Sequence, residues 1–479
     1  MTRSIAANIR GLTLAIATTF LVTSVGVGYW TLVAGDELGN DPFNPRLVAA
    51  IRDRPRGFIK DSAGNTLAES VQTPDGYKRV YRDKTLAQVT GYASFQFGAS
   101  GVEAAYAESL IGQDPGDPLS QWRARYLRER APPGSIVLGI DPKVQKAAVD
   151  ALGGRRGAIV AIDPRNGAIL ASASWPQYDA SLISDPATED AAWKQVTADP
   201  DKPLINRVTQ GLYPPGSTFK IITGAAALES GVDPNAKVRV DDPWQADKSW
   251  GSYFVRSSSR AHGDYTMADG YRLSENIYFA KIGLQIGGPK LAEYAQRFGI
   301  GSSTHCDITA AKGQLSTAGV LDRPTLVADT AYGQGELLVS PLQMALIYAT
   351  IANGGVMPTP HYATSVRDNQ GHVIREIAPG PIGQVIRPDT ARALTAMLVG
   401  AVEGPGAFAF GAKIPNVHVA GKTGTAENVP GSAPHGWFIG FAPAEQPTVV
   451  VAVIVENTPE GGVTAAPLGA AVMRAALNK

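Results

Sequence analysis

One stretch near the N-terminus constrains this chain more than any other feature of its sequence. Residues 12–34 contain no charged side chain, and a helix of these 23 residues is long enough to cross a hydrocarbon core of about 30 Å. Tyr29 and Trp30 lie toward its far end, where aromatic side chains favour the lipid–water interface. A cleaved signal peptide is the alternative, but its apolar region spans only about 7–15 residues. The sequence therefore predicts an uncleaved transmembrane anchor over 12–34.

The charges on either side of this anchor predict its orientation. Arg3 and Arg10 precede it, whereas Asp36 and Glu37 follow it closely. Because basic residues favour the cytoplasmic side of a membrane, we expect a cytoplasmic tail over 1–11 and an extracytoplasmic location for everything after the anchor. No later run reaches about 18 uninterrupted apolar residues, so a single-pass protein of the cell membrane is predicted.

Charge and cysteine content narrow the function classes open to the exterior part. The 43 basic and 43 acidic side chains cancel, so there is no basic field to hold a nucleic-acid backbone, and no nucleic-acid partner is expected. Cys306 is the only cysteine, which excludes an internal disulfide and metal sites built on several cysteines. The six histidines show no HxxH or HExxH spacing. A zinc hydrolase is therefore disfavoured.

Hydrophobic periodicity predicts an α+β fold for the exterior. In the part of the exterior after residue 134, strand patterns occur near both ends and helical patterns lie between them. This arrangement indicates a sheet assembled from distant segments. The expected elements are a hairpin over 58–68, helices over 101–110, 142–152 and 465–477, and strands over 135–140, 157–163, 168–173, 436–441 and 448–456. We divide the exterior into an N-terminal non-catalytic module, 35–150, and a larger domain, 151–479.

Ser217 is the only serine followed three residues later by a lysine, Lys220. Two prolines and Gly216 make a turn before the apolar run 219–228, which places Ser217 in the first turn of a predicted helix. The spacing brings the hydroxyl and the ammonium group within hydrogen-bond reach. A serine needs an adjacent base to act as a nucleophile, and a lysine serves when burial and a nearby cation lower its pKa. Taken alone, such a pair is more often a helix cap beside a solvated lysine.

A second short motif, Ser274-Glu275-Asn276, is the only Ser-x-Asn in the chain. It stands just before an apolar segment, so an ordinary helix cap is the simpler interpretation when the motif is taken alone. A hydroxyl and a carboxamide two residues apart on a tight turn can also point into one cleft. There the hydroxyl of Ser274 would relay a proton and Asn276 would hold an amide.

The third motif, Lys422-Thr423-Gly424-Thr425, contains the only Lys-Thr-Gly and lies in a strand-like stretch. Strand alternation predicts Lys422 and Gly424 on one face and the two threonines on the other. Because Gly424 lacks a Cβ, we expect it to let an extended substrate backbone approach the strand edge. A plain edge strand with a solubilising lysine is the alternative for the motif taken singly.

The three motifs together, in this order and outside a membrane, resemble those of the class B, monofunctional penicillin-binding proteins, the D,D-transpeptidases of bacterial peptidoglycan. The resemblance extends from about Arg56 to the C-terminus and includes 332–335, 340–345 and 436–441. It implies an elongated N-terminal module of the pedestal or dimerisation type. After it comes a transpeptidase domain with an antiparallel sheet flanked by helices and an all-helical lobe. Only about 120 residues separate the anchor from that domain, which argues against the bifunctional class A enzymes.

The resemblance implies a role for each residue that reacts with substrate or moves a proton. Ser217 would attack the carbonyl between two D-alanines of a stem peptide, with Lys220 as the base. Ser274 and Lys422 would pass the proton to the leaving D-alanine. The acyl-enzyme would then react with an amine of a neighbouring stem peptide, and a β-lactam would acylate the same serine as an inhibitor.

The resemblance also implies which groups bind the substrate. Asn276 would hold its amide, and Thr423 and Thr425 beside Gly424 would bind its terminal carboxylate. Backbone N–H groups of Ser217 and Thr425 would form the oxyanion hole. No metal and no organic cofactor is implied. A polytopic membrane glycosyltransferase is the implied protein partner, contacted through the anchor and the N-terminal module.

Four other functions remain to be weighed against the transpeptidase. A D,D-carboxypeptidase, in which water takes the acyl group, differs little in sequence, and the long N-terminal module favours the transpeptidase. A β-lactam receptor is disfavoured because the predicted tail, 1–11, leaves no room for an effector domain. A catalytically silent scaffold is disfavoured by the intact Ser217, Lys220 and Lys422. Glu275 in place of aspartate, with no assignable E-x-x-x-N glutamate, leans away from β-lactamase.

Overall fold

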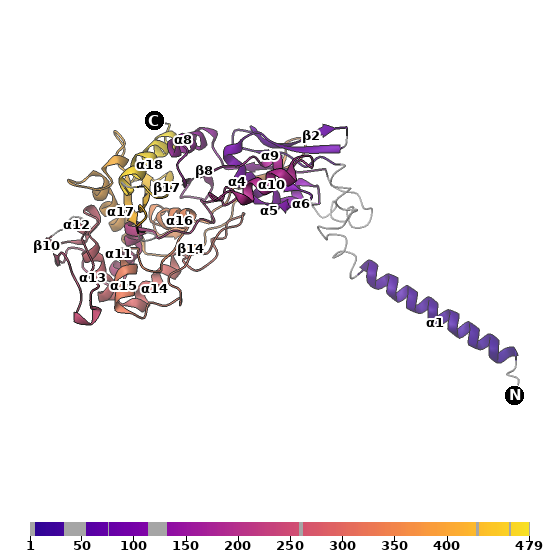
Figure 1. Ribbon diagram of the computed structural model, residues 1–479, viewed down its shortest axis with the longest axis horizontal. Coiled ribbons are helices and arrows are strands. Elements are labelled where there is room, and N and C mark those ends of the chain that lie inside the picture. The colour runs from indigo at the N-terminus through magenta and orange to yellow at the C-terminus, as the bar shows by residue number, and fades with distance from the viewer. Residues whose placement is uncertain are drawn as a thin grey trace.

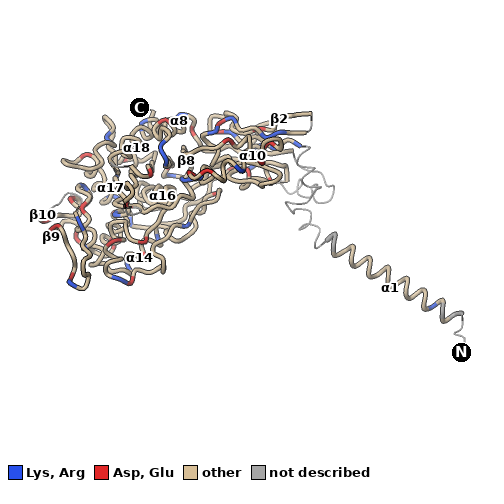
Figure 2. The backbone as a smooth tube through the Cα atoms, viewed as in Figure 1, with Lys and Arg blue, Asp and Glu red and all other residues tan. Residues whose placement is uncertain are grey.

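The computed structural model describes residues 5–32, 54–74, 76–113, 132–257, 262–427, 431–458 and 461–478. A long helix, α1 (Ile5–Leu32), stands apart from the folded body (Figure 1). Its segment Ile9–Tyr29 is apolar and long enough to cross a membrane once, and Figure 2 shows it almost free of charged residues. The prediction of one apolar helix near the N-terminus is therefore confirmed, although residues 33 and 34 lie outside the described ranges.

A six-stranded sheet organises the part of the body that follows the anchor. Its strand order is β13-β12-β6-β1-β2-β3, with only the β1–β6 pair parallel. The strands are β1 (Ile59–Lys60), β2 (Thr66–Thr73), β3 (Gly76–Tyr81), β6 (Ser135–Leu138), β12 (Ala363–Arg367) and β13 (Val373–Glu376). The hairpin predicted over 58–68 is confirmed by the antiparallel β1–β2 pair. Residues 363–376 return to this sheet from far along the chain.

Short elements complete this part and join it to the rest. The helix predicted over 101–110 is present as α5 (Gly101–Ala105) and α6 (Ala107–Leu110), interrupted at Tyr106. The other elements are η1 (Lys84–Leu86), α4 (Ala87–Thr90), β4 (Ala93–Ser94), β5 (Gly98–Ala99), α9 (Ala180–Ile183) and α10 (Glu189–Ala198). Asp307 ties the two parts together, because its carboxylate accepts hydrogen bonds from Tyr106 Oη at 2.9 Å and from the backbone N–H groups of Tyr362 and Ala363.

A five-stranded antiparallel sheet, ordered β15-β16-β17-β7-β8, forms the centre of the larger part. Its strands are β7 (Gly157–Ile162), β8 (Ile169–Trp175), β15 (Ala420–Ala426), β16 (His435–Ala442) and β17 (Val449–Val455). The predicted strands over 157–163, 168–173, 436–441 and 448–456 are confirmed. The strand that carries Lys422 lies at one edge of the sheet, so its outer side is open to a ligand.

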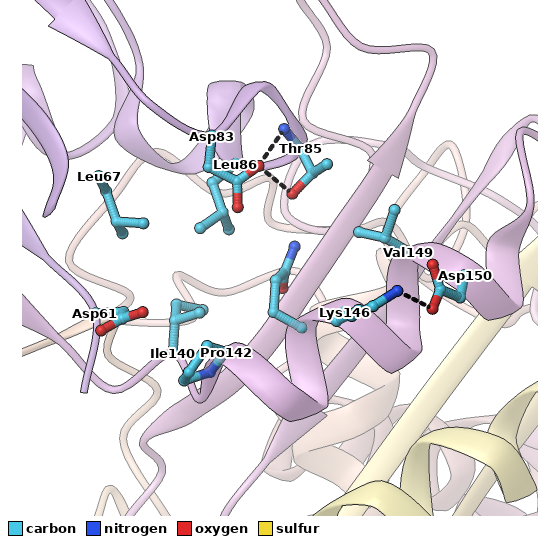
Figure 3. A pocket seen from close by; sticks show the side chains of 11 residues that line it. Asp61, Leu67, Asp83, Thr85, Leu86, Ile140, Pro142, Lys146, Val149 and Asp150 are labelled. Carbon is cyan, nitrogen blue, oxygen red and sulfur yellow. Dashed lines mark hydrogen bonds and ion pairs between the residues drawn. The ribbon is translucent and has the colours of Figure 1, made fainter. Parts of the chain in front are cut away.

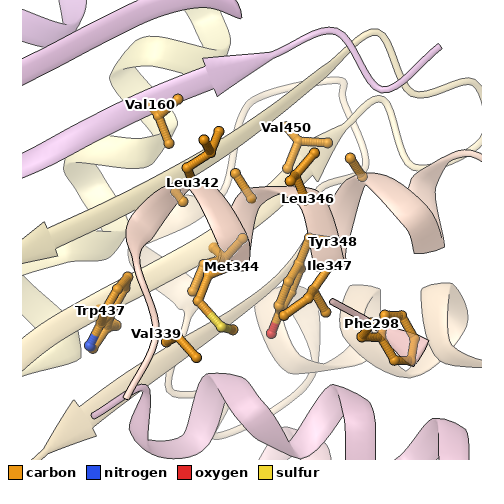
Figure 4. Packing of buried hydrophobic residues seen from close by; sticks show 14 of the residues in the cluster. Val160, Phe298, Val339, Leu342, Met344, Leu346, Ile347, Tyr348, Trp437 and Val450 are labelled. Atoms are coloured by element: carbon orange, nitrogen blue, oxygen red, sulfur yellow. The ribbon is translucent and has the colours of Figure 1, made fainter. Parts of the chain in front are cut away.

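Helices cover both faces of this sheet. On one face lie α8 (Pro142–Leu152) and α18 (Gly462–Ala476), which confirm the helices predicted over 142–152 and 465–477. On the other face lies α16 (Pro341–Ala352), apolar around almost its whole circumference and therefore fully enclosed. Figure 4 shows Leu342 and Leu346 of α16 packed beneath Val160 of β7 and Val450 of β17. This core fixes the sheet against the helices that carry the site.

The helical lobe lies beyond α11 (Lys220–Glu229) and α17 (Pro388–Glu403). Its helices are α12 (Met267–Arg272), α13 (Asn276–Ile286), α14 (Gly288–Arg297) and α15 (Pro324–Ala331), and it also carries a two-stranded ribbon, β9 (Val238–Asp241) and β10 (His262–Tyr265). The remaining short elements are η2 (Gly216–Phe219), η3 (Lys248–Trp250), β11 (Val356–Met357), β14 (Gly383–Gln384) and η4 (Phe410–Ala412).

A pocket of about 360 Å³ lies where α8 meets η1 and the β1–β2 turn (Figure 3). Leu67, Leu86 and Val149 make up part of its apolar wall. Its polar groups bond to one another, as in the 2.6 Å pair between Lys146 Nζ and Asp150 Oδ2. We assign it no ligand, because its acidic side chains already have partners within the fold.

Candidate active site

Ser217 lies in the short helical turn η2, directly before α11, and Lys220 is the first residue of α11. Gly216 of this turn has φ 55°, and a Cβ there would come within 2.6 Å of Thr425 O on β15. Gly333 approaches from the opposite side, and its carbonyl accepts the N–H of Gly216 at 2.8 Å. The turn therefore packs closely against both the edge strand β15 and the backbone at Gly333. Only glycine permits that approach on both sides.

Lys220 Nζ lies at the centre of the site and contacts three groups. Ser217 Oγ is 2.9 Å away, Ser274 O 2.7 Å and Asn276 Oδ1 2.8 Å. An ammonium group has three N–H donors, one for each of these neighbours. After the loss of one proton, two donors remain for the two carbonyl oxygens, and the lone pair faces Ser217 Oγ. The neutral amine is thus placed to accept the serine proton.

The second lysine reaches the same site from the edge strand. Lys422 Nζ donates to Ser274 Oγ at 2.7 Å and to Thr423 O at 3.1 Å. Ser274 Oγ also lies 3.5 Å from Lys220 Nζ, so this hydroxyl stands between the two amines. Both lysines are fully buried, with exposed fractions of 0% and 1%. The structure therefore brings together residues that are up to 205 positions apart in the sequence.

Burial shifts both lysines toward the neutral form. It lowers the pKa of Lys422 from an ordinary 10.5 to about 7. Burial also lowers the pKa of Lys220 well below its ordinary value, and the positive charge of Lys422 lowers it further, while the negative charge of Glu275 opposes this effect. The neutral, proton-accepting form of Lys220 is therefore favoured more than it is in an exposed lysine.

The tight turn that carries Ser274 has a backbone that few side chains adopt. Ser274 has φ 55°, in the left-handed region, and Glu275 then caps the N-terminus of α13. The Asn276 carboxamide is held at both ends, since Nδ2 donates to Arg256 O at 3.1 Å while Oδ1 accepts from Lys220. Its second N–H has no hydrogen-bond partner among the described residues, which leaves it available to the carbonyl of an incoming amide.

The edge strand β15 shows the alternation that the sequence predicts, with one correction. Lys422 and Gly424 face the nucleophile turn, whereas Thr425 faces the residues that precede α18. A Cβ on Gly424 would meet Pro215 O at 2.8 Å and Thr218 Cγ2 at 3.0 Å. The glycine therefore gives room to the turn that carries Ser217. The correction is that the missing Cβ of Gly424 makes room for protein. Approach of a substrate backbone to the edge of this strand stays a prediction.

A groove of about 600 Å³ opens above these residues. Ser217, Ser274, Asn276, Thr423 and Thr425 all line it, which brings the hydroxyl and amide groups of the three motifs into one cavity. Its walls also contain residues that the sequence patterns did not single out: Tyr253, Phe254, Arg256, Ser257, Asp329, Phe408 and Glu427. The groove is long and partly aromatic, as a binding site for an extended peptide should be.

Two clusters missed by the sequence patterns support the groove. The hydroxyls of Tyr253 and Tyr332 both donate to the Asp329 carboxylate in its wall. The second cluster steadies the chain just before the nucleophile, since Trp437 Nε1 donates to Pro214 O at 2.9 Å. Tyr332 and Trp437 lie in segments that carry the family resemblance, 332–335 and 436–441, but no sequence pattern indicated these contacts or pointed to Tyr253 and Asp329.

Metal ligation finds no support in the described residues. They contain no group of three or more histidine, cysteine and acidic side chains placed to hold an ion. Burial raises the pKa of the Cys306 thiol well above its ordinary value, so this cysteine is held in its unreactive form. The polar groups that meet at this site are the hydroxyls of Ser217 and Ser274 and the amines of Lys220 and Lys422.

Comparison with known proteins assigns this arrangement to a family. A model described as the penicillin binding protein transpeptidase domain matches residues 157–474. The chain belongs to the penicillin-binding transpeptidase family. A second model, the penicillin binding protein A dimerisation domain, matches residues 56–137 of this transpeptidase. Residues 157–474 contain the five-stranded sheet, and residues 56–137 contain the first strands of the six-stranded sheet.

Relatives of this penicillin-binding transpeptidase match along almost its whole length. The peptidoglycan D,D-transpeptidase PbpA of Mycolicibacterium smegmatis is 34% identical, over 98% of this chain and 99% of the relative. The PbpA of Mycobacterium tuberculosis is 32% identical with the same coverage. A solved structure of penicillin-binding protein A from M. tuberculosis, a ceftriaxone acyl-enzyme complex, superposes with a TM-score of 0.81 at 30% identity, over 90% of this chain and 100% of that one.

Proposed function

We propose that this chain is a peptidoglycan D,D-transpeptidase that cross-links stem peptides through an acyl-enzyme on Ser217. The single observation that carries the proposal is the position of Lys220 Nζ, buried and 2.9 Å from Ser217 Oγ. A hydroxyl beside a buried neutral amine is an activated nucleophile. Family membership and the names of the relatives support the same reaction and the same substrate class.

The first half-reaction forms an ester. Ser217 Oγ attacks the carbonyl between the two terminal D-alanines, and its proton passes to Lys220 Nζ. Backbone N–H groups of Ser217 and Thr425 stabilise the oxyanion of the tetrahedral intermediate. The C–N bond then breaks, and the leaving amine takes a proton delivered through Ser274 Oγ from the lysine pair, so that free D-alanine departs.

The second half-reaction releases the enzyme. An amine of a neighbouring stem peptide attacks the ester carbonyl, the C–O bond to Ser217 breaks, and the serine recovers a proton. Asn276 holds the substrate amide, while Thr423 and Thr425 bind the terminal carboxylate beside Gly424. A β-lactam presents a similar amide and carboxylate, so it acylates Ser217 and blocks the cycle. The steps use side chains and backbone N–H groups of the protein and require neither a metal nor an organic cofactor.

We also propose the placement of the enzyme at the membrane. Residues 1–11 form a cytoplasmic tail, 12–34 the single membrane span, 35–150 a non-catalytic module and 151–479 the transpeptidase domain, which faces the exterior. The charges that flank the apolar helix support this orientation. The module and the span would contact a polytopic membrane glycosyltransferase, which supplies the glycan strands that carry the stem peptides.

Mass spectrometry of the protein after reaction with benzylpenicillin tests the nucleophile. We expect a single adduct on the peptide that contains Ser217, and none in Ser217→Ala. Incubation with a donor pentapeptide and an amine acceptor tests the second half-reaction. A cross-linked product is expected, whereas release of D-alanine without that product would identify a carboxypeptidase. An adduct on another residue would contradict the proposal.

A further inference from the structure

A buried carboxylate that no step above uses belongs to the turn that holds Lys220. Glu275 is the middle residue of the turn between Ser274 and Asn276, and its exposed fraction is 0%. Both of its chain neighbours accept hydrogen bonds from Lys220 Nζ. An ionised carboxylate without access to water costs free energy unless hydrogen bonds and opposite charge compensate it. The turn therefore retains a costly group at the place where the base is held.

The hydrogen bonds of this carboxylate hold the turn in shape. Glu275 Oε1 accepts from Ile277 N at 3.1 Å, which caps α13, and Oε2 accepts from Ser257 Oγ at 2.6 Å. Its backbone N–H donates to Gly270 O at 2.9 Å. These three bonds fix the backbone directly after Ser274, the residue with the left-handed φ. The carbonyl and carboxamide that grip Lys220 are therefore set by the surroundings of Glu275.

The charges near Glu275 give it a second effect. Lys220 on α11 and Lys422 on β15 are the buried cations of the site. The neighbouring elements also bring the phenols of Tyr271 on α12 and Tyr265 on β10, and the ion pair between Asp269 and Arg272 on α12. The negative charge of Glu275 acts on Lys220. With both lysines protonated, the three charges sum to one positive. Once Lys220 loses its proton, Lys422 and Glu275 balance.

We propose that Glu275 is a positioning residue for acylation: it holds the turn that grips Lys220, and its charge balances the one ammonium that the site keeps when Lys220 acts as the base. The inference rests on the proposed function, because it concerns the reaction of Ser217. It predicts that the charge and the hydrogen bonds of Glu275 have separable effects. The charge sets the pH below which the acylation rate declines, and the hydrogen bonds set the acylation rate at every pH.

Two variants separate these effects. Glu275→Gln keeps the shape, because its amide oxygen still accepts from Ile277 N and its NH₂ donates to Ser257 Oγ, but it removes the charge. Ser257→Ala keeps the charge and removes one hydrogen bond. The second-order rate of acylation by a fluorescent penicillin is measured on the full chain in detergent, from about pH 5 to about pH 9. Circular dichroism confirms that each variant is folded.

Loss of the negative charge makes Lys220 harder to protonate, so the acid limb of the E275Q profile should move to lower pH by about one unit. S257A should lower the rate a few-fold at every pH and leave the limb in place. An E275Q limb that coincides with that of the wild type overturns the inference while the proposed function stands. A wild type that is never acylated on Ser217 overturns the proposed function itself.

A third variant keeps the inference testable if E275Q does not fold. Glu275→Asp retains the charge but shortens the side chain, so its acylation should be slower with the acid limb unmoved. A limb displaced by about a full unit in E275D would show that charge at this position does not control the profile.

Discussion

Two of the buried charge clusters, one beside Ser217 and one in the module next to the anchor, are compensated differently. In the module, Glu103 on α5 is fully buried and bonds Arg79 Nε at 2.6 Å and Arg56 Nη2 at 2.8 Å. Tyr81 Oη donates to the same carboxylate at 3.2 Å. At the nucleophile, two ammonium groups share one nearby carboxylate and are linked to each other through a hydroxyl.

The pKa directions follow from this difference. Burial raises the pKa of Glu103, but the two guanidinium groups outweigh it and the net pKa lies below the ordinary value, so the group stays charged. At the active site, burial dominates and lowers the pKa of both lysines. A buried charge that is paired with close opposite charges stays ionised and stabilises the fold. Buried lysines with too little opposite charge nearby release a proton more easily and can accept one during a reaction, as acyl transfer requires.

The largest effect should come from removing the base. Lys220→Met keeps the side-chain length but cannot accept the serine proton, so acylation by penicillin should slow by about 10²- to 10⁴-fold. The thermal midpoint should not fall, because a buried ammonium group is replaced by an apolar side chain. Lys281→Met on the adjacent helix α13 is the control and should change the rate by less than about twofold. Acylation of K220M at the control rate would contradict the comparison.

Removal of the Glu103 carboxylate in the module should instead lower stability and leave the acylation rate nearly unchanged. Glu103→Gln leaves two guanidinium groups without a counter-charge, so unfolding of the module should become easier by about 3–5 kcal/mol, measured by denaturant titration. The folded protein should still be acylated by penicillin at nearly the wild-type rate. Glu69→Gln removes a carboxylate from an exposed pair with Arg82 in the same sheet and should cost less than about 1 kcal/mol. Equal stability of E103Q and E69Q would remove the distinction between the clusters.

The two clusters should also respond to different pH ranges. Lys422 keeps its proton up to about pH 10.4 when unfolded, but releases it near pH 7 when folded, so unfolding takes up a proton between these values. Stability should therefore rise from pH 7 toward pH 9, by up to about 1.4 kcal/mol per unit from this lysine.

Lys422→Met should flatten that rise, and thermal melts across the range measure it. Glu103 acts in the acid window, because its pKa is lowered on folding. Its contribution is present above its unfolded pKa of about 4.3 and is lost as the pH falls through its folded pKa. E103Q should therefore leave the slope between pH 7 and pH 9 unchanged, and a slope that disappears in E103Q would assign the effect to the wrong cluster.

The smallest effect on stability is expected at an exposed ion pair, which serves as the reference for the two buried clusters. Lys146 and Asp150 bond across one turn of α8 at the pocket of Figure 3, and both side chains are largely solvent-exposed. Asp150→Asn should change the unfolding free energy by less than about 0.5 kcal/mol, and high salt should abolish the difference. A loss of 2 kcal/mol or more, measured by denaturant titration, would show that geometry rather than burial separates these clusters.

Local patterns predicted most of the elements that position the site. The apolar run of the anchor, the strands over 157–163 and 168–173, and the strands after β15 are each encoded in one short continuous segment, so hydrophobic patterns alone find them. The segment 363–376 escaped prediction, because its first strand, β12, pairs with β6, more than 220 residues away. A strand's partner across such a distance leaves no local pattern.

The sequence by itself determined which side chains carry the chemistry. The S-x-x-K spacing places Ser217 beside Lys220 because three residues make almost one helical turn, and the unique S-x-N and K-T-G motifs supply the remaining polar groups. Only the tertiary structure decided that Lys422 meets Ser274 across 148 residues, that Gly424 makes room for protein, and that Glu275 is enclosed with the lysines. The physical reason is that pKa values and close approach depend on burial, which distant segments create only when they pack together.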